Sequence, residues 1–381
     1  MLNNLSISLT NCVGFFELIS LPLAVISLSV LLFYYFYFFI KLHFYKSKNS
    51  SFNKPISIII CAKNELDNLR KNLPIILAQN YFNFEVIVVN DQSSDESTFF
   101  LNELAKENKH LIIVNIDDFV THGLGKKFAL TLGIKTAKHE HLLLTDADCI
   151  PNSKDWVKQM SSNFNDAEII LGYGSYEKKK GLLNKIIRFE TFNVAQQYLS
   201  YALAEKTYMG VGRNLAYKKS LFFDNKGFAS HIHIPSGDDD LFIQEIALNS
   251  TVAIEMANDG QTTSEVIKSW KDWIYQKRRH LSTAPLYKAK FKVLLGLYPL
   301  AQLLFLVSVI LLFIVKTSLL YILILLALKL LVSYIVNYKT MKRLNVHDLY
   351  WIHPIYETLN LLIQVNFVLL NLFKKPKKWR R

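Results

Sequence analysis

An apolar run ends on two closely spaced carboxylates at Leu142–Pro151 (LLLTDADCIP), where a single residue separates Asp146 from Asp148. If the run is a buried strand, both carboxylates lie at the carboxyl edge of a sheet, where open α/β sheets bind ligands. Oxygen ligands at such an edge suit Mg²⁺ or Mn²⁺, which is commonly shared with a substrate diphosphate. The alternative is a polar strand end followed by a proline turn, and an isolated Asp-x-Asp would favour it.

The surrounding chain predicts a sheet that positions these carboxylates. Residues from about 55 to 285 alternate between apolar strand-like runs and amphipathic helix-like runs, which predicts a parallel sheet with helices on both faces. The strand-like runs are Ile56–Cys61, Phe84–Val89, Leu111–Val114 and His141–Thr145, and the helix-like runs are Asn64–Gln79, Ser94–Lys106 (with Ser94 as N-cap) and Lys126–Thr136. Parallel strands would present the polar residues that follow them on one rim: Lys63, Glu65, Asn90, Asp91, Asp146 and Asp148.

Seven motifs in this order resemble those of family 2 glycosyltransferases, in particular inverting, membrane-attached members with the GT-A fold. They are PISIIICAKNE (Pro55–Glu65), VVNDQSSDES (Val88–Ser97), GLGKKFAL (Gly123–Leu130), TDAD (Thr145–Asp148), GVGRNLAY (Gly210–Tyr217), SGDDDLF (Ser236–Phe242) and QKRRH (Gln276–His280). The resemblance covers roughly residues 55 to 285 and implies an α/β, Rossmann-like nucleotide-sugar domain. Neither GxGxxG nor GxxxxGK[ST] is present, so the chain shows neither a dinucleotide fingerprint nor a P-loop.

The resemblance implies roles for the residues that match these motifs. Asp91 would contact the base or ribose, Asp148 would bind the metal directly, and Asp146 would lie nearer the sugar or ribose. Lys126 or Lys127 would contact the nucleotide, although both could be solvated lysines at a helix end. The full set expected at the donor is Ala62, Asn64, Glu65, Asp91, Lys126, Lys127, Asp146, Gly210, Gly212, Arg213, Gln276, Arg278 and Arg279, and the two glycines would permit close backbone approach.

The three consecutive carboxylates of SGDDDLF point to a general base. Such neighbours repel one another unless a cation, hydrogen bonds or protonation relieves them, so one of them is expected to have a raised pKa. A base that works near neutral pH needs this property. By resemblance the base is Asp238 if Asp240-Leu241 matches the family's Asp-Leu pair, with Asp239 as the alternative because Gly237 replaces the usual Glu. The structural alternative is an acidic first turn of a helix.

QKRRH matches the family's QxxRW motif at Gln276 and Arg279, but His280 stands where the family has Trp. In processive polysaccharide synthases that Trp helps to form the acceptor platform, so its absence puts processive polymerisation in doubt. Arg278 and Arg279 could stabilise a leaving diphosphate through charge-assisted hydrogen bonds. The segment 265–285 also has the composition of an amphipathic helix at a membrane surface.

The two ends of the chain predict membrane segments. Leu18–Ile40, Val293–Val315 and Ser318–Val336 are long enough to cross a bilayer. Tyr350–Phe373 is more polar and is predicted to be interfacial or re-entrant, with a third C-terminal membrane span as the alternative. Lysines after the first segment place the middle of the chain in the cytoplasm. The expected organisation is an N-terminal anchor (1–45), a catalytic domain (50–285) and C-terminal membrane segments with a basic tail (290–381).

The net charge of +13 is concentrated beside these segments, where it favours lipid headgroups over nucleic acid. We therefore expect an integral protein of the bacterial plasma membrane with a cytoplasmic catalytic domain. It would transfer a sugar from a nucleotide-sugar donor, a UDP-sugar by resemblance, to a hydroxyl of a lipid-linked or glycan acceptor, using Mg²⁺ or Mn²⁺ and an Asp base. The alternatives are a polymerising polysaccharide synthase and an inactive scaffold that binds nucleotide sugar.

Overall fold

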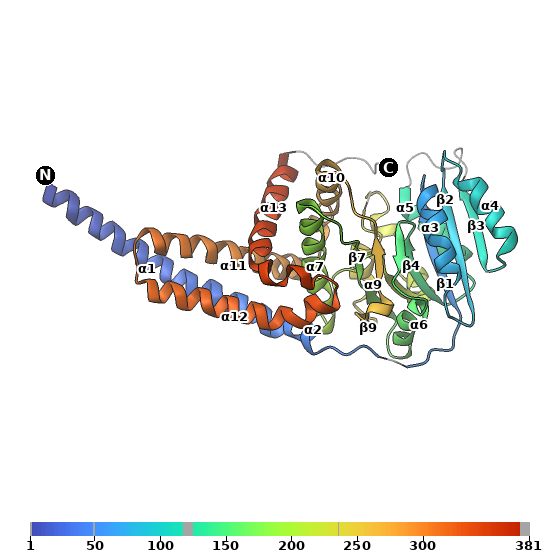
Figure 1. Ribbon diagram of the computed structural model, residues 1–381, viewed down its shortest axis with the longest axis horizontal. Helices are drawn as coiled ribbons and strands as arrows, with labels where there is room; N and C mark the ends of the chain where they lie inside the picture. The colour runs from blue at the N-terminus through green and yellow to red at the C-terminus, as the bar shows by residue number, and fades with distance from the viewer. Residues whose placement is uncertain (1, 49, 117–124, 235, 374–381) are drawn as a thin grey trace.

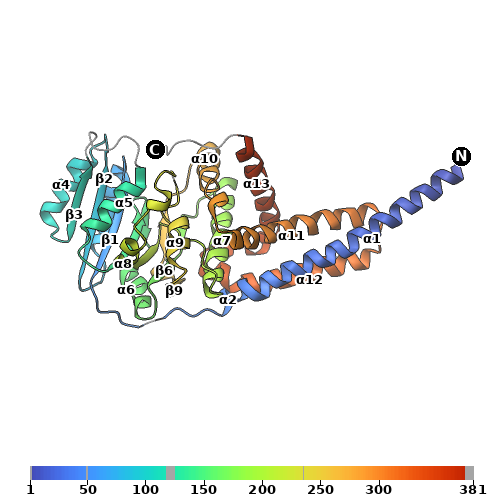
Figure 2. The same ribbon diagram turned by 180° about the vertical axis from the view of Figure 1, so that it is seen from behind.

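A computed structural model of the protein describes residues 2–48, 50–116, 125–234 and 236–373. An α/β domain lies at one end of the molecule, and long helices lead away from it (Figures 1 and 2). The basic tail expected at 374–381 and Gly123 of the GLGKKFAL motif lie outside the described residues.

The main sheet has seven strands in the order β3-β2-β1-β4-β8-β6-β9. Strands β3, β2, β1 and β4 are parallel, but β8 is antiparallel to both of its neighbours. Strands β6 and β9 pair parallel to each other, so the prediction of a parallel sheet is wrong for β8 alone among the described strands of this sheet. Strand β8 follows the Gly210–Arg213 segment, which lies at the rim, and therefore runs away from it. The strands are β1 (Ile56–Ala62), β2 (Phe84–Asp91), β3 (Leu111–Ile116), β4 (His141–Asp146), β6 (Ile169–Gly172), β8 (Leu215–Lys218) and β9 (Val252–Glu255).

A second sheet of three short strands stands beside the rim, in the order β5-β10-β7. Its strands are β5 (Cys149–Pro151), β10 (Thr262–Ser264) and β7 (Gly174–Tyr176). Because β5 begins directly after Asp148 and pairs with β10, this sheet fixes the backbone on the C-terminal side of the Asp-x-Asp segment.

Both faces of the main sheet are buried, as strand β1 illustrates. Ile58 and Ile60 pack in one core with side chains of α3, α4 and α6, whereas Ile59 packs in a second core with α5. This alternation follows from the period of two along a strand. At Gly133 of α5 a Cβ would lie 2.8 Å from Cγ2 of Ile59, so glycine lets α5 approach the sheet closely. The helices are α3 (Leu66–Leu77), α4 (Ser97–Glu107), α5 (Gly125–Thr136) and α6 (Trp156–Ser161).

Four further α-helices belong to this domain, and two of them, α7 and α10, lie between the main sheet and the long helices (Figure 1). The four helices are α7 (Leu182–Leu203), α8 (Lys219–Asp224), α9 (Asp240–Ile246) and α10 (Trp270–His280). Short 3-10 helices form η2 (Ser162–Asn165), η3 (Ala229–His231), η4 (Asn258–Gly260), η5 (Ala284–Leu286) and η6 (His347–Ile352).

Three helices in the described part of the chain are long and apolar enough to cross a membrane: Phe16–Phe44, Ala289–Ile314 and Leu319–Arg343. They correspond to α1 (Leu2–Tyr34) continued by the π-helical η1 (Tyr35–Phe39) and α2 (Ile40–Phe44), to α11 (Ala289–Ile314) and to α12 (Leu319–Arg343). They run side by side, while α13 (His353–Phe373) turns across them toward α7 and α10 (Figures 1 and 2). That α13 lies at the membrane interface stays a prediction.

A buried ion pair joins α13 to these helices. Glu357 of α13 accepts from Lys329 of α12 at 3.0 Å, and its other oxygen accepts from Tyr35, Tyr298 and Gln302. A carboxylate in an apolar bundle is costly unless it is paired and hydrogen-bonded. These four donors meet that condition, so the network specifies where α13 docks.

Arg188 connects α7 to the turn between α12 and α13. Its side chain donates to both carboxylate oxygens of Asp348, at 2.9 and 2.6 Å, and to the Asn345 carbonyl at 2.9 Å. These bonds hold the pKa of Asp348 at about 2. Lys178 reaches the same carboxylate at 3.2 Å, but its side chain is largely exposed.

Replacing Arg188 by Met should lower the free energy of unfolding by roughly 2 kcal/mol, because a partly buried carboxylate and a carbonyl lose their main donor. The matched change Lys178→Met removes the exposed partner of the same carboxylate and should cost less than about 0.5 kcal/mol. Thermal unfolding of the detergent-solubilised chain measures both values. Equal losses would contradict the assigned role of Arg188.

Candidate active site

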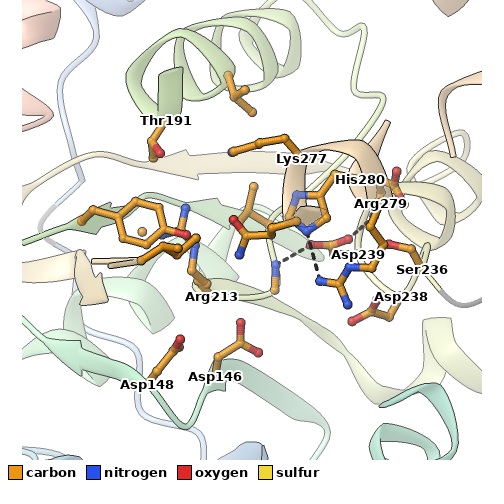
Figure 3. Close-up of a pocket in the computed structure, with 18 of the residues that line it drawn as sticks. Asp146, Asp148, Thr191, Arg213, Ser236, Asp238, Asp239, Lys277, Arg279 and His280 are labelled. Atoms are coloured by element: carbon orange, nitrogen blue, oxygen red, sulfur yellow. Dashed lines mark hydrogen bonds between the residues drawn. The ribbon is translucent and has the colours of Figure 1, made fainter. Parts of the chain in front are cut away.

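A cavity of about 1170 Å³ opens at the carboxyl edge of the main sheet and extends between α7, α10 and α13. It brings together residues from all seven sequence motifs, and Figure 3 shows the carboxylates and basic side chains that converge on it. The predicted site residues that line it are Ala62, Asn64, Glu65, Asp91, Lys126, Asp146, Asp148, Gly212, Arg213, Asp238, Asp239, Gln276 and Arg279.

Lys126, in the first turn of α5, is the cation at the centre of the carboxylates. Its Nζ lies 2.7 Å from Oδ1 of Asp146 and 3.2 Å from Oδ2 of Asp238. Burial alone would raise the pKa of both carboxyl groups, but the ammonium group outweighs it and lowers both pKa values. Asp146 and Asp238 are therefore anionic at neutral pH.

Asp239 has the opposite electrostatic environment. Burial, followed by the charges of Asp238 and Asp240, raises the pKa of Asp239 to about 7. Its Oδ2 accepts from the Gly212 amide at 2.9 Å and its Oδ1 from the Asp240 amide at 2.9 Å. These bonds fix the carboxyl group at the cavity wall. Of the two candidate bases, Asp239 has the pKa suited to exchanging a proton near neutrality.

Asp240 and Gly237 shape the turn that presents Asp239. Asp240 is buried and accepts from Thr283 and Tyr287, which tie the start of α9 to the segment after α10. Gly237 has φ of +104°, and a Cβ there would lie 2.7 Å from Cδ1 of Leu241. The glycine that replaces the family's usual Glu is thus required by the backbone of this turn.

The oxygen ligands expected for a cation are those of Asp146 and Asp148. Their carboxylate oxygens and the Cys149 sulfur lie within 4.8 Å of one another. Burial raises the pKa of Cys149, so this residue is a thiol at neutral pH and a poor metal ligand. Two carboxylates facing an open cavity fit a hard divalent ion that takes its remaining ligands from substrate and water.

The loops after β1 and β2 are fastened to each other at the rim. Asn64 has φ of +55°, and its Oδ1 accepts from the Ser94 amide at 2.8 Å and from the Ser94 hydroxyl. The predicted N-cap at Ser94 is therefore wrong: α4 begins at Ser97, whose amide donates to Asp95 at 3.1 Å. Ser94 instead holds Asn64 beside Asp91, which lines the same cavity.

Helix α10 forms the wall opposite the sheet edge. Ser269 caps it by accepting from the Asp272 amide, and Trp273 packs edge-on against Phe367 of α13. The Arg279 guanidinium points into the cavity near Asp238 and Asp239, with His280 next to it (Figure 3). Burial, followed by the charges of Arg279 and Lys277, lowers the pKa of His280, so the imidazole is neutral at pH 7.

Three predicted site residues do not line the cavity. Lys127 is buried and donates to the His231 carbonyl at 2.6 Å and to the Ile234 carbonyl. Arg278 donates to Asn371 and to the Leu370 carbonyl, which joins α10 to α13. At Gly210 a Cβ would meet Leu215 at 2.9 Å, so this glycine serves packing rather than ligand approach.

Several cavity residues were not predicted from the sequence. Glu190 of α7 forms a largely buried ion pair with Lys277 of α10, and Tyr176 lies under the Arg213 guanidinium at 4.4 Å. Glu190 lies among other polar residues of α7, such as Arg188 and Thr191, so no local pattern singled it out. The polar side chains of α13 suggested only an interfacial helix, yet Asn360 and Gln364 line the cavity.

Comparisons with known proteins agree with this geometry. Residues 57–224 match the profile of the family described as Glycosyl transferase family 2. A poly-beta-1,6-N-acetyl-D-glucosamine synthase of Staphylococcus aureus (strain MSSA476) is 31% identical over 138 residues, which are 35% of this chain and 32% of that protein. An uncharacterized glycosyltransferase of Haemophilus influenzae is 28% identical over 133 residues, 34% of this chain and 40% of that protein.

Among solved structures, a mannosyltransferase, PcManGT, from Pyrobaculum calidifontis in complex with GDP-Man and Mn²⁺ matches with a TM-score of 0.56. The match covers 90% of this chain and 99% of that chain at 18% identity, so it concerns the fold alone. It confirms the predicted α/β fold of the GT-A type. The match of residues 57–224 to the family 2 glycosyltransferase profile confirms the resemblance drawn from the motifs. The chain spans about a third of the length of the curated relatives.

The two glycines of GVGRN should respond differently to the same change. Gly210→Ala should lower the free energy of unfolding by about 1–3 kcal/mol, because the new methyl group overlaps Leu215 and Ile243. Gly212→Ala places its methyl group no closer than 3.6 Å to Lys126 Nζ, so thermal stability should be nearly unchanged. Thermal unfolding of the two variants tests the contrast. Equal destabilisation would mean that Gly212 is also a packing residue.

Proposed function

We propose that this chain is a membrane-bound, inverting glycosyltransferase that moves a sugar from a nucleotide-sugar donor to an acceptor hydroxyl. The observation that carries the proposal is the convergence of Asp146, Asp148, Lys126 and Asp239 on one cavity. Metal-binding oxygens, a fixed cation and a carboxyl group with a pKa near 7 are the groups that this displacement requires.

The donor diphosphate would lie at the sheet edge, near Asp146 and Asp148. Their oxygens would hold Mg²⁺ or Mn²⁺, which when bound would neutralise charge on the departing diphosphate. Asp91, at the end of β2, lies beside this position and would contact the base or ribose. A UDP-sugar is the donor that the resemblance favours.

Asp239 would act as the general base. Its two backbone donors hold it in a fixed position while the acceptor hydroxyl approaches the anomeric carbon. As the oxygen–carbon bond forms, Asp239 takes the hydroxyl proton and the carbon–phosphate oxygen bond breaks. The attack comes from the face opposite the diphosphate, so an α-linked donor gives a β-linked product. Asp238 would stay anionic and paired with Lys126.

Arg279 would stabilise the leaving group from the opposite wall. Its Nε is buried and has no hydrogen-bond partner among the described residues, and its guanidinium faces the space between the carboxylates (Figure 3). A diphosphate oxygen in the cavity would accept a charge-assisted hydrogen bond from this guanidinium. Donors that are already in place when charge develops lower the barrier without reorganisation.

A lipid-linked acceptor fits the far part of the cavity. Leu295 of α11 and Ile363 and Phe367 of α13 line this part, and α11 is one of the helices that could cross a membrane. An acceptor held in the bilayer could therefore present its polar head to Asp239 while its apolar part remains near these helices. The catalytic domain would face the cytoplasm, where nucleotide sugars are made.

A polymerising synthase is the second candidate, favoured by the name of the Staphylococcus relative. His280 argues for single transfer, because a neutral imidazole offers a smaller stacking surface than the family's Trp. The measurement that separates the candidates is a panel of nucleotide sugars incubated with the purified chain and a bacterial lipid extract, with products identified by mass spectrometry. One added sugar supports the proposal, a ladder supports the synthase, and no product with any donor supports an inactive scaffold.

Asp239→Asn should reduce kcat by about 10²–10⁴-fold, because the base is lost while donor contacts remain. In the wild type, kcat/KM should fall as pH drops through about 7, since only the deprotonated Asp239 accepts the proton. Initial rates across pH, together with calorimetric donor binding, measure both effects.

Asp238→Asn is the matched control for this assignment. The charge of Asp238 raises the pKa of Asp239, so its removal should move the acid limb of kcat/KM to lower pH while transfer persists. If Asp238→Asn abolished transfer and Asp239→Asn did not, the two roles would be reversed.

Chelation should abolish transfer, and added Mn²⁺ or Mg²⁺ should restore it. Asp148→Asn should weaken Mn²⁺ binding to the purified chain by about tenfold or more, because the cation loses an anionic oxygen ligand. Asp259→Asn, an exposed carboxylate outside the cavity, should leave binding unchanged. Calorimetry with Mn²⁺ alone tests this without activity, and identical affinity of Asp148→Asn and wild type would exclude Asp148 as a ligand.

A further inference from the structure

A second cavity, of about 490 Å³, lies where the long helices meet the α/β domain. Its walls come from the segment after α2, from the β9–η4 turn and from the end of α12. They are lined by Tyr45, Lys46, Ser47, Met256, Ala257, Asn258, Lys339, Lys342, Arg343 and Asn345. None of these described residues lines the catalytic cavity, so the two sites are separate.

The lining of this cavity is basic. It contains Lys46, Lys339, Lys342 and Arg343 but no carboxylate. Among the described residues, none of these four side chains forms an ion pair with a carboxylate. Arg343 instead donates to the Leu42 carbonyl at 2.8 Å, which fastens α12 to α2. The remaining three lysines bring like charges to one cavity, so an anion bound there would be attracted by all of them.

The nearest acid does not neutralise this charge. Glu255 precedes the β9–η4 turn, but it is fully buried and its oxygens accept from neutral groups. The donors are Ser47 at 2.9 Å, the Ala257 amide at 2.6 Å, Gln159 at 3.0 Å and Asn163 at 3.1 Å. Glu255 therefore supports the cavity wall and leaves the lysines without a counterion among the described residues.

The position of the cavity indicates the class of anion. Lys46 lies two residues after the first candidate span, and Lys339, Lys342 and Arg343 belong to the last turns of the third. If these helices cross a bilayer, the cavity lies at the depth of the lipid headgroups on the side of the α/β domain. Basic pockets at such helix ends bind anionic headgroups, and the volume is within the usual range for small-ligand sites.

We propose that this cavity binds the phosphate headgroup of an anionic phospholipid. Lys339 and Lys342 contact the phosphate, Lys46 closes the site from the other helix, and the acyl chains lie along α12. The site joins two parts of the molecule, because Asn345 donates to Asn258 and Gln261 at 3.0 Å and Gln261 donates to the Arg343 carbonyl at 2.8 Å. A bound headgroup therefore stabilises the junction between membrane helices and domain.

The test is lipid binding by the full chain purified in neutral detergent. Native mass spectrometry should show one phosphatidylglycerol retained in preference to phosphatidylcholine, and phosphatidylglycerol should raise the thermal unfolding midpoint. The double variant K339Q/K342Q should bind phosphatidylglycerol at least about tenfold more weakly, since each lysine near an anionic headgroup contributes to affinity. Lys46→Gln should weaken phosphatidylglycerol binding less than the double variant does. It replaces the double variant as the test if K339Q/K342Q is unstable.

The matched control is K290Q/K292Q, which removes the same charge at the start of α11 but outside the cavity. It should keep affinity within about twofold of wild type if the cavity is the site. An equal loss in both double variants would show diffuse surface attraction and overturn the proposal. Equal stabilisation by inorganic phosphate would show a free-anion site, and equal retention of the two lipids would show no site. None of these readouts depends on the transfer reaction.

Discussion

The ion pairs of Lys126 are the interaction on which the rest of the site depends. Asp146 at the end of β4 and Asp238 just before α9 are distant in sequence, and each lies within 3.2 Å of the same ammonium group. Without it, two partly buried carboxylates would repel each other and the neighbouring Asp148 and Asp239. With this ammonium group present, Asp146 and Asp238 stay anionic, and Asp239 is the carboxyl group of the three whose pKa is raised. One ammonium group thus keeps Asp146 and Asp238 ionised, while the neighbouring Asp239 keeps a raised pKa.

The position of Lys126 follows from backbone packing. Helix α5 starts at Gly125 and lies close to β1 and β2 because Gly133 has no side chain. This closeness aims the first turn of α5 at the carboxyl ends of the strands. One residue on, the helix points Lys127 the other way, where its ammonium group holds the turn before Gly237. The two adjacent lysines therefore support the same carboxylates, one directly and one through the backbone that carries them.

The features that depend on local sequence pattern were predicted correctly, whereas those that depend on packing between distant segments were not. Apolar runs separated by helix-like segments predicted β1, β2 and β4 correctly, so the polar residues that follow these strands at the rim were predicted as well. A motif cannot say which of two neighbouring residues faces a cavity, and for that reason Lys127 and Arg278 were included. The direction of β8 and the contribution of α7 depend on contacts between segments distant in sequence. Glu190 is an example, since its meaning appears only when Lys277 lies beside it.

The cavity wall formed by α13 depends on the long apolar helices rather than on the sheet. Helix α13 is held by the Lys329–Glu357 pair, by Arg278 and by packing of Phe367 on Trp273. It contributes one side of the cavity, while α10 carries Arg279 on the adjacent side. A displacement of α13 would therefore open the cavity next to the arginine that faces the carboxylates. The polar network inside the helix bundle therefore sets the shape of this wall, so that under the proposed function the long helices are a component of the active site as well as an anchor.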